Sequence, residues 1–211
     1  MSSFVLKIIA MVAMTMDHLN YVIYDHITWL NYIGRLAFPI FAWQIVVGFE
    51  KTRDVKKYIF RLFVLAIISQ PFFYLLFGEF MSVFTLNTIF TLLFGLLCLC
   101  ALKKSEFLGL LVTLATCMLS EYVHFDYGSF GILMIVIFYL FRNNKGLMVL
   151  FQLANLGVYQ FFHPNSIEMY SFVAILLILL YNGKRGYNVK YLFYVFYPLH
   201  LLILYILSIY I

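Results

Sequence analysis

The sequence predicts an all-α fold: a polytopic membrane helix bundle of about nine transmembrane helices, with the N-terminus in and the C-terminus out. Three observations predict it. Of the 211 residues, 65% are hydrophobic and only 11% are charged, whereas about a quarter of a soluble domain is charged. Apolar runs recur along the whole chain, and the basic residues cluster in alternate intervals between them. This pattern excludes a soluble domain and leaves no continuous basic face for nucleic acid.

The expected helices follow the apolar runs, because a spanning helix needs roughly 20 mostly apolar residues. They are expected at Phe4–Tyr24, Leu30–Phe49, Tyr58–Phe77, Phe84–Leu102, Phe107–Ser120, Tyr127–Phe141, Leu147–Phe162, Met169–Tyr181 and Tyr191–Ile211. The connecting stretches are short, so residues 1–211 are expected to form a single transmembrane domain in the lipid bilayer.

The orientation follows from the basic residues, of which 12 of 14 fall on one side of the alternation. These are Lys7, Lys51, Arg53, Lys56, Lys57, Lys103, Lys104, Arg142, Lys145, Lys184, Arg185 and Lys190. The loops on the other side, at 25–29, 78–83, 121–126 and 163–168, contain no Lys or Arg. Because positive loops stay in the cytoplasm, the amino terminus is expected inside.

Four residues in the early helices are unusual for a lipid environment: Asp17, His18, Arg35 and Arg61. A charge at mid-membrane costs at least about 2.5–3.5 kcal/mol, so such residues are functional candidates. His18 and Arg35 are expected at similar depths, roughly 7–9 Å from the outer ends of their helices. We therefore expect an Asp17–Arg35 ion pair beside His18. A purely structural pair, a core histidine and an Arg61 that reaches the headgroups are the alternatives.

Further polar residues are expected in the outer half of the bundle. Gln70 and Asn87 lie in the third and fourth helices, and Asp126 and Tyr127 precede the sixth. They are candidate substrate-binding residues, although amides in membrane helices more often hold helices together.

This set of residues favours group transfer. A histidine held by a carboxylate can act as a general base, and a neighbouring arginine can stabilise an oxyanion. Arg61, with Lys56 and Lys57 before it, could capture the phosphates of a soluble donor. A proton-coupled transporter or channel uses the same residue types and is the alternative. No spacing typical of metal ligands is present.

Several blocks of the sequence resemble the TraX family. They are KIIAMVAMTMDH at 7–18, IGRLAFPIF at 33–41, KYIFRLF at 57–63 with SQP at 69–71, DYGSFG at 126–131 and FYPLHL at 196–201. These blocks occur in the family's order and are spread over most of the length of the chain.

The resemblance implies an acetyltransferase of the bacterial cytoplasmic membrane that uses acetyl-CoA. It implies that His18 is the catalytic base or the acetyl carrier, that Asp17 orients it, and that Arg35 lines the same site. Arg61 is then a candidate for the CoA phosphates, and His200 is a candidate substrate-binding residue, as a second polar group in the acyl channel. The implied acceptor is extracytoplasmic, either a pilin-like peptide or an envelope glycan. A non-enzymatic assembly factor for exported proteins is a further alternative.

Overall fold

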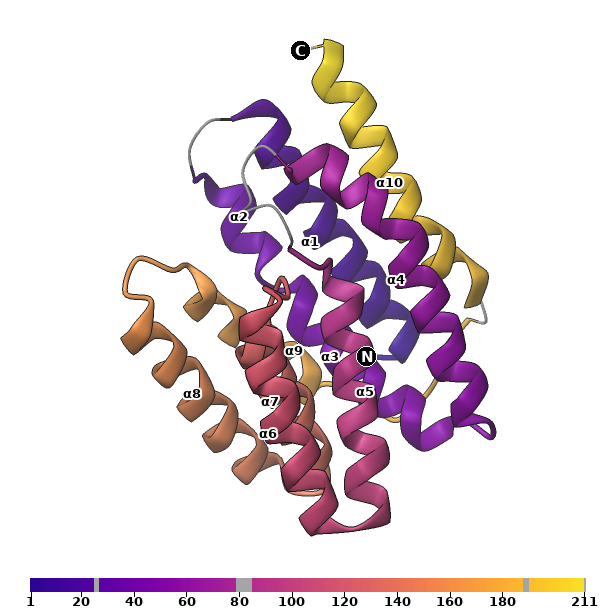
Figure 1. The fold of residues 1–211 in the computed structure, drawn as a ribbon. Helices are drawn as coiled ribbons and strands as arrows, with labels where there is room; N and C mark the ends of the chain where they lie inside the picture. Colours follow the sequence, from indigo (N-terminus) through magenta and orange to yellow (C-terminus); the bar gives the residue numbers. More distant parts are fainter. Residues whose placement is uncertain (25–26, 79–84, 188–189, 211) are drawn as a thin grey trace. The chain divides into compact units, whose positions relative to one another are not determined.

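The computed structural model describes residues 1–24, 27–78, 85–187 and 190–210. Within these ranges the chain forms helices joined by irregular connections (Figure 1). One isolated β-bridge pairs Leu86 with Phe125. The helices are α1 (Ser3–Ile23), α2 (Trp29–Gly34), α3 (Ala37–Lys51), α4 (Val55–Phe77), α5 (Thr88–Lys104), α6 (Glu106–Tyr122), α7 (Gly128–Leu140), α8 (Lys145–Phe162), the 3-10 helix η1 (Glu168–Ser171), α9 (Phe172–Leu179) and α10 (Lys190–Tyr210).

Helices of the described ranges fill all nine expected segments, so the all-α prediction is confirmed. Two expected helices are each divided into two pieces: α2 and α3 share one segment, and η1 and α9 share another. The fourth begins at Thr88, because Asn87 caps it. The expected helix ends Phe84 and Ile211, and parts of the loops at 25–29 and 78–83, lie outside the described residues.

The described helices have the length and composition of a membrane protein. Four segments are long and apolar enough to cross a bilayer: Ser3–Ile23, Trp29–Lys51, Val55–Phe77 and Tyr191–Tyr210. Large apolar side chains are exposed on the helix surfaces, as at Phe60 (66% exposed) and Phe107 (70% exposed). Such surfaces suit lipid rather than water.

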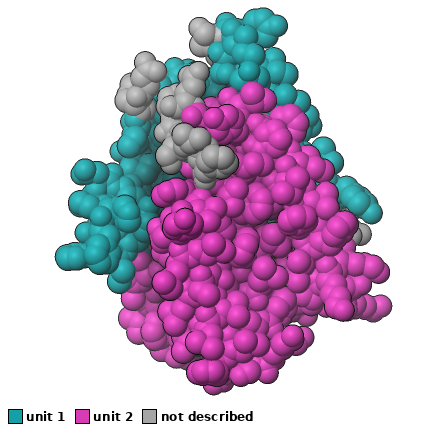
Figure 2. Space-filling model, in the orientation of Figure 1, with its two compact units in different colours: residues 1–44, 156–211 teal, residues 45–155 magenta. Residues whose placement is uncertain are grey.

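The chain forms two compact units, coloured separately in Figure 2. Unit 1 contains Met1–Gln44 and Leu156–Ile211, and unit 2 contains Ile45–Asn155. The chain passes from one unit to the other within α3 and again within α8. The expectation of a single domain stays a prediction.

Unit 1 is built around α1, which packs against α2 and α10. Leu6 and Ala10 of α1 are completely buried, as is Leu201 of α10. The first turn of α1 is held by the segment that follows α9: the amides of Ser3 and Phe4 donate to the carbonyls of Lys184 (2.9 Å) and Arg185 (3.0 Å). These bonds satisfy amides that a helix start leaves without partners.

Unit 2 is built around α5, which packs against α4, α6 and α7. The α5 side chains are buried almost all round, as are Ile132 and Met134 of α7. The α8 residues Gln152 and Asn155 add polar links, because their side-chain amides donate to the carbonyls of Met134 (2.9 Å) and Phe130 (3.2 Å). Amide contacts of this kind join helices inside membranes.

Candidate functional site

A break between two helices positions Arg35. Residue 35 is the C-cap of α2, and its amide donates to the carbonyl of Asn31. After Leu36 the chain starts α3 at Ala37, so Pro39 lies in the first turn of α3. Proline is tolerated there because first-turn amides have no partner within the helix. The break therefore places a guanidinium inside what the sequence predicted to be one continuous span.

Gly34 allows α2 to approach α1 closely at this point. A Cβ at residue 34 would lie 2.3 Å from the Cβ of Asp17 and 2.5 Å from its Oδ1. Real Cβ atoms do not come so close to other atoms, so only glycine fits without movement of Asp17. The backbone of α2 thus lies directly against the carboxylate.

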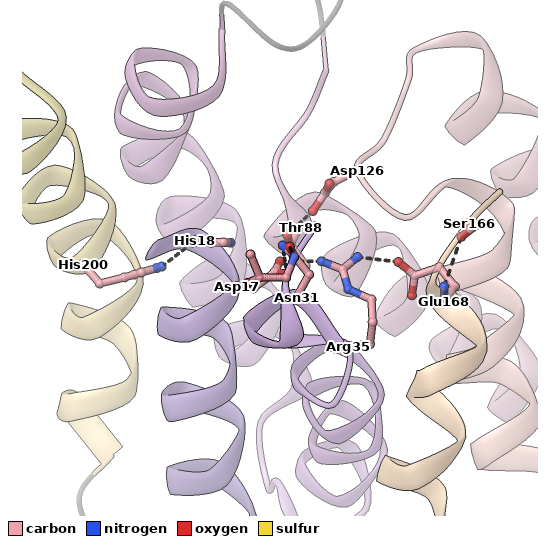
Figure 3. Close-up of polar contacts among 10 residues, drawn as sticks. Asp17, His18, Asn31, Arg35, Thr88, Asp126, Ser166, Glu168 and His200 are labelled. Atoms are coloured by element: carbon pink, nitrogen blue, oxygen red, sulfur yellow. Dashed lines mark hydrogen bonds and ion pairs between the residues drawn. The ribbon is translucent and has the colours of Figure 1, made fainter. Parts of the chain in front are cut away.

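The centre of the site is an ionic network of three side chains, Asp17, Arg35 and Glu168 (Figure 3). Arg35 Nη2 lies 2.5 Å from Asp17 Oδ2, and Arg35 Nη1 lies 2.5 Å from Glu168 Oε1. The three side chains are only 10–12% exposed. One cation faces two anions, so the ionised network carries a formal charge of −1.

Polar neighbours hold both acidic residues in place. The side-chain amide of Asn31 donates to Asp17 Oδ1 (3.1 Å). Asn31 lies one helical turn before Arg35, so the two residues reach Asp17 from the same side of α2. Glu168 begins η1, and its own amide donates to Ser166 Oγ (3.1 Å). Buried charges need such partners, since an unpaired one costs several kcal/mol.

A pair of histidines lies beside this network, joining α1 to α10 (Figure 3). His18 Nδ1 lies 3.0 Å from His200 Nε2, and the two rings are nearly parallel, at an interplanar angle of 16°. His200 Nδ1 donates to the carbonyl of Phe196 (3.0 Å), and the His200 side chain is buried. A carbonyl oxygen can only accept a hydrogen bond, so His200 Nδ1 must carry the proton.

In unit 2, Gln70 and Asn87 form a neutral amide clamp between α4 and the start of α5. The Asn87 side chain accepts from the amide of Ile89 and donates to Gln70 Oε1 (2.8 Å) and to the carbonyl of Ala66 (2.9 Å). Gln70 in turn accepts from the Asn87 amide (3.0 Å) and donates to the carbonyl of Thr85 (2.9 Å). Neighbouring groups use nearly all of the hydrogen-bonding atoms of Gln70 and Asn87. These contacts do not test substrate binding, so that role stays a prediction.

Asp126 and Tyr127 lie at the start of α7. The Asp126 carboxylate accepts from the Thr88 hydroxyl, and its amide donates to the carbonyl of Leu86 (2.9 Å). Tyr127 occupies the N-cap position of α7. Asp126 therefore connects the starts of α5 and α7 within unit 2. A role in substrate binding stays a prediction for both residues.

The basic candidates Lys56, Lys57 and Arg61 lie in the first two turns of α4. Lys56 is exposed, and Lys57 makes an ion pair of 3.3 Å with Asp54. The Arg61 guanidinium lies over the ring of Tyr58, 5.9 Å from its centroid. Its Nε is buried and finds no hydrogen-bond partner in the described part of the chain. Arg61 thus has donor capacity that this structure does not use.

The structure forms the expected Asp17–Arg35 ion pair. The Asp17 carboxylate contacts Arg35 and Asn31, and His18 contacts the imidazole of His200. The expectation that Asp17 orients His18 stays a prediction. The expectation from the sequence placed His200 in the acyl channel without pairing it with His18. It also gave no role to Glu168 or Asn31. The spacing of Asn31, one turn before Arg35, was a usable signal, whereas nothing near Glu168 in the sequence indicates its partner.

Comparisons with known proteins show which proteins the chain is similar to. Over 229 residues the chain is 29% identical to a Dichelobacter nodosus protein described as "Probable fimbrial assembly protein FimC, serogroup H1", covering 96% of this chain and 94% of that protein. It is 32% identical over 85 residues to an uncharacterized protein of Rickettsia prowazekii (strain Madrid E), which covers 40% of this chain and 32% of that protein. No solved structure matches the chain. The profile of the TraX protein family matches residues 2–208, and the chain belongs to that family.

Proposed function

We propose that this protein is a membrane-bound acetyltransferase that moves an acetyl group from cytosolic acetyl-CoA to an amine or hydroxyl of an envelope or exported acceptor. The observation that carries the proposal is the contact between His18 and His200 beside the buried Asp17–Arg35–Glu168 network. A histidine held by a hydrogen bond on one ring nitrogen can use the other as a general base.

In the proposed reaction, His18 takes the proton from the acceptor as its nitrogen or oxygen attacks the acetyl carbonyl carbon. The new C–N or C–O bond forms, the thioester C–S bond breaks, and the sulfur leaves with the bonding electron pair. His18 then returns the proton to the sulfur, which gives the free thiol of CoA. Arg35 acts as a positioning residue, because both of its terminal nitrogens bind carboxylates.

The proposal assigns recognition of the donor phosphates to α4. Phosphate groups bind arginine and lysine through charge-assisted hydrogen bonds. Arg61 fits this task because its buried Nε has no partner in the described part of the chain. Lys56 and Lys57 are exposed one turn earlier and supply further positive charge. Acetyl-CoA supplies the activated acetyl thioester, and the chain supplies the base.

The proposed topology is nine spans in the bacterial cytoplasmic membrane, with the amino terminus inside and the carboxyl terminus outside. Its support is the run of basic residues at the α3–α4, α5–α6, α7–α8 and α9–α10 connections. Helices α5 and α6 have 17 residues each, or about 26 Å, slightly less than the roughly 30 Å hydrocarbon core. Local thinning of the bilayer accommodates such helices. Reporter fusions after α9 and after α10 should show opposite sides of the membrane.

The acceptor proposed first is the amino group of an exported, pilin-like peptide, and an envelope glycan is the second choice. The Dichelobacter nodosus relative is described as a probable fimbrial assembly protein, which supports a connection with surface fibres. The same name supports a non-enzymatic assembly factor as an alternative. Release of free CoA in proportion to acceptor modification separates the two, since an assembly factor releases none.

A second candidate function, a proton-coupled transporter or channel, is favoured by one observation. The ionic network contains one more carboxylate than cations, and a pair of imidazoles lies beside it. Buried groups of this type bind and release protons in transporters. Proton-dependent flux of a solute without consumption of acetyl-CoA would favour this function over acetyl transfer.

The first experiment is calorimetric titration of the purified wild-type protein, and of His18→Ala and Arg61→Ala, with acetyl-CoA. We expect micromolar binding that is kept in His18→Ala and weakened about 10- to 100-fold in Arg61→Ala, the effect of one lost charge-assisted hydrogen bond. Arg53→Ala is the matched control, because Arg53 is an exposed arginine of the same basic segment. Absence of binding to the wild type would remove acetyl-CoA from the proposal and favour the transporter.

A further inference from the structure

We propose that His200 is a positioning residue that fixes the ring tautomer of His18, so that His18 Nδ1 carries the proton and His18 Nε2 is the basic nitrogen. The inference rests on the proposed function for its chemical consequence, but the tautomer itself follows from hydrogen-bond geometry within unit 1.

The hydrogen bond to Phe196 determines which ring nitrogen of His200 carries the proton. Its Nδ1 lies 3.0 Å from the carbonyl oxygen of Phe196, one helical turn earlier in α10. The carbonyl oxygen has lone pairs and no proton, so Nδ1 must be the donor. When His200 carries a single ring proton, that proton is therefore on Nδ1, and Nε2 presents a lone pair.

The lone pair on His200 Nε2 determines in turn which ring nitrogen of His18 carries the proton. His18 Nδ1 lies 3.0 Å from His200 Nε2, within hydrogen-bond distance. Two lone pairs would repel each other at this separation, so His18 Nδ1 must donate to His200 Nε2. A singly protonated His18 then has its lone pair on Nε2, the nitrogen that serves as base in the proposed reaction.

Aromatic packing holds the His200 ring in the orientation that this contact needs. The ring stacks on Phe196, with centroids 4.6 Å apart and an interplanar angle of 4°, and also contacts the ring of Tyr197. The His200 side chain is buried, so it has few alternative rotamers. A side chain fixed by packing and by a backbone hydrogen bond is well suited to orient a second residue.

The chain contains a matched control for this arrangement. His163 also places its Nδ1 against the carbonyl four residues earlier, that of Tyr159 (3.2 Å), and stacks on the ring of that residue with centroids 4.4 Å apart. The local contacts of His163 thus repeat those of His200, but its side chain is exposed. Replacing His163 removes the same local motif without touching the proposed site.

The test compares His200→Phe, His200→Gln and His163→Phe. His200→Phe keeps a ring for packing but removes the acceptor, whereas His200→Gln keeps a side-chain acceptor. Nitrogen NMR of protein with labelled histidine reports which ring nitrogen of His18 carries the proton, and His18→Gln identifies its signals. We expect the Nδ1-protonated form of His18 in the wild type, His163→Phe and His200→Gln, and a mixture of both tautomers in His200→Phe.

The kinetic readout is acetyl transfer from acetyl-CoA to an amine acceptor. We expect His200→Phe to lower kcat about 10- to 100-fold with the KM for acetyl-CoA unchanged, a smaller loss than removal of a general base causes. His200→Gln should recover most of kcat. An unprotonated Nδ1 on His18 in the wild type would overturn the inference, as would the same kcat for His200→Phe and His163→Phe.

Failure of this inference differs from failure of the proposed function. If the wild type transfers no acetyl group, the acetyltransferase proposal fails, and the NMR experiment still decides the tautomer. If the wild type is active but His18 has a proton on Nε2, the acetyltransferase survives and the role of His200 is wrong. If His200→Phe does not fold, His200→Gln and the wild-type spectrum decide the question.

Discussion

The two units contain buried polar networks of opposite character. In unit 1, Arg35 joins two carboxylates, so two acidic side chains face one basic side chain. In unit 2, Gln70 and Asn87 join neutral groups, and nearly every donor and acceptor is used by a neighbour or by the backbone. The neutral network has few unused donors or acceptors. The ionic network has more acidic than basic side chains, so it can bind a further proton or cation.

The two networks should also differ in how much stability a substitution removes. Removing one partner of a buried ion pair leaves an uncompensated charge and costs about 3–5 kcal/mol. Removing one neutral hydrogen bond between membrane helices costs about 0.6 kcal/mol on average. The ionic network should therefore respond much more strongly to substitution than the amide clamp does.

The largest effect is expected for Arg35→Met. The substitution leaves Asp17 and Glu168 facing each other without a cation, so we expect a loss of about 3–5 kcal/mol of stability, measured by thermal unfolding in detergent. Arg53→Met, which removes an exposed arginine, is the control. Adding Asp17→Asn and Glu168→Gln to Arg35→Met should restore much of the stability. Equal stability of Arg35→Met and Arg53→Met would show that the ion pairs of Arg35 do not stabilise the fold.

The next effect is expected for Gly34→Ala. The added Cβ meets the side chain of Asp17 and forces α2 away from α1, so we expect a loss of about 1–3 kcal/mol. Gly157→Ala is the control, because a Cβ at this α8 position meets nothing within 4 Å. Alanine should stabilise that helix by up to about 1 kcal/mol. If both variants unfold at the same temperature, the close approach at Gly34 is not required.

A smaller effect is expected in the neutral clamp. Asn87→Ala removes the cap of α5 and two side-chain hydrogen bonds, and should cost about 1–2 kcal/mol. A double-mutant cycle with Gln70→Ala should give a coupling of about 0.5–1.5 kcal/mol, because the two residues are bonded directly. A coupling near zero would mean that the two amides act independently. Acetyl-CoA binding should stay at the wild-type level in both single variants.

The smallest effect is a pH dependence at the start of α4. Asp54 caps this helix, and the hydrogen bond from the Lys57 amide lowers the pKa of the Asp54 carboxyl below its ordinary value of 3.8. Because the folded-state pKa is lowered, the stabilisation is present above the unfolded-state pKa and is lost as pH falls through the folded-state value. Asp54→Asn should keep the cap and remove this dependence. The measurement is the unfolding temperature of both proteins from neutral to acid pH.

The sequence predicts the helices well because apolar runs recur along the chain and the intervals between them are polar or basic. It also predicts the Asp17–Arg35 pair, because the rise per residue places both side chains at one level. It does not predict Glu168, which is 133 positions from Arg35, because only tertiary packing determines such a contact. The break after Gly34 was missed as well, since the hydropathy of Trp29–Lys51 is continuous.

The discontinuous makeup of unit 1 has a consequence for biosynthesis. The first helical hairpin emerges from the ribosome with Asp17 and Arg35 already available to neutralise each other, whereas Glu168 and His200 are translated last. At about 5–20 residues per second, many seconds separate the two events. The Asp17–Arg35 pair can therefore form first, whereas the second carboxylate arrives with η1 and the imidazole contact only with α10. A truncated chain that lacks α10 cannot contain the His18–His200 pair.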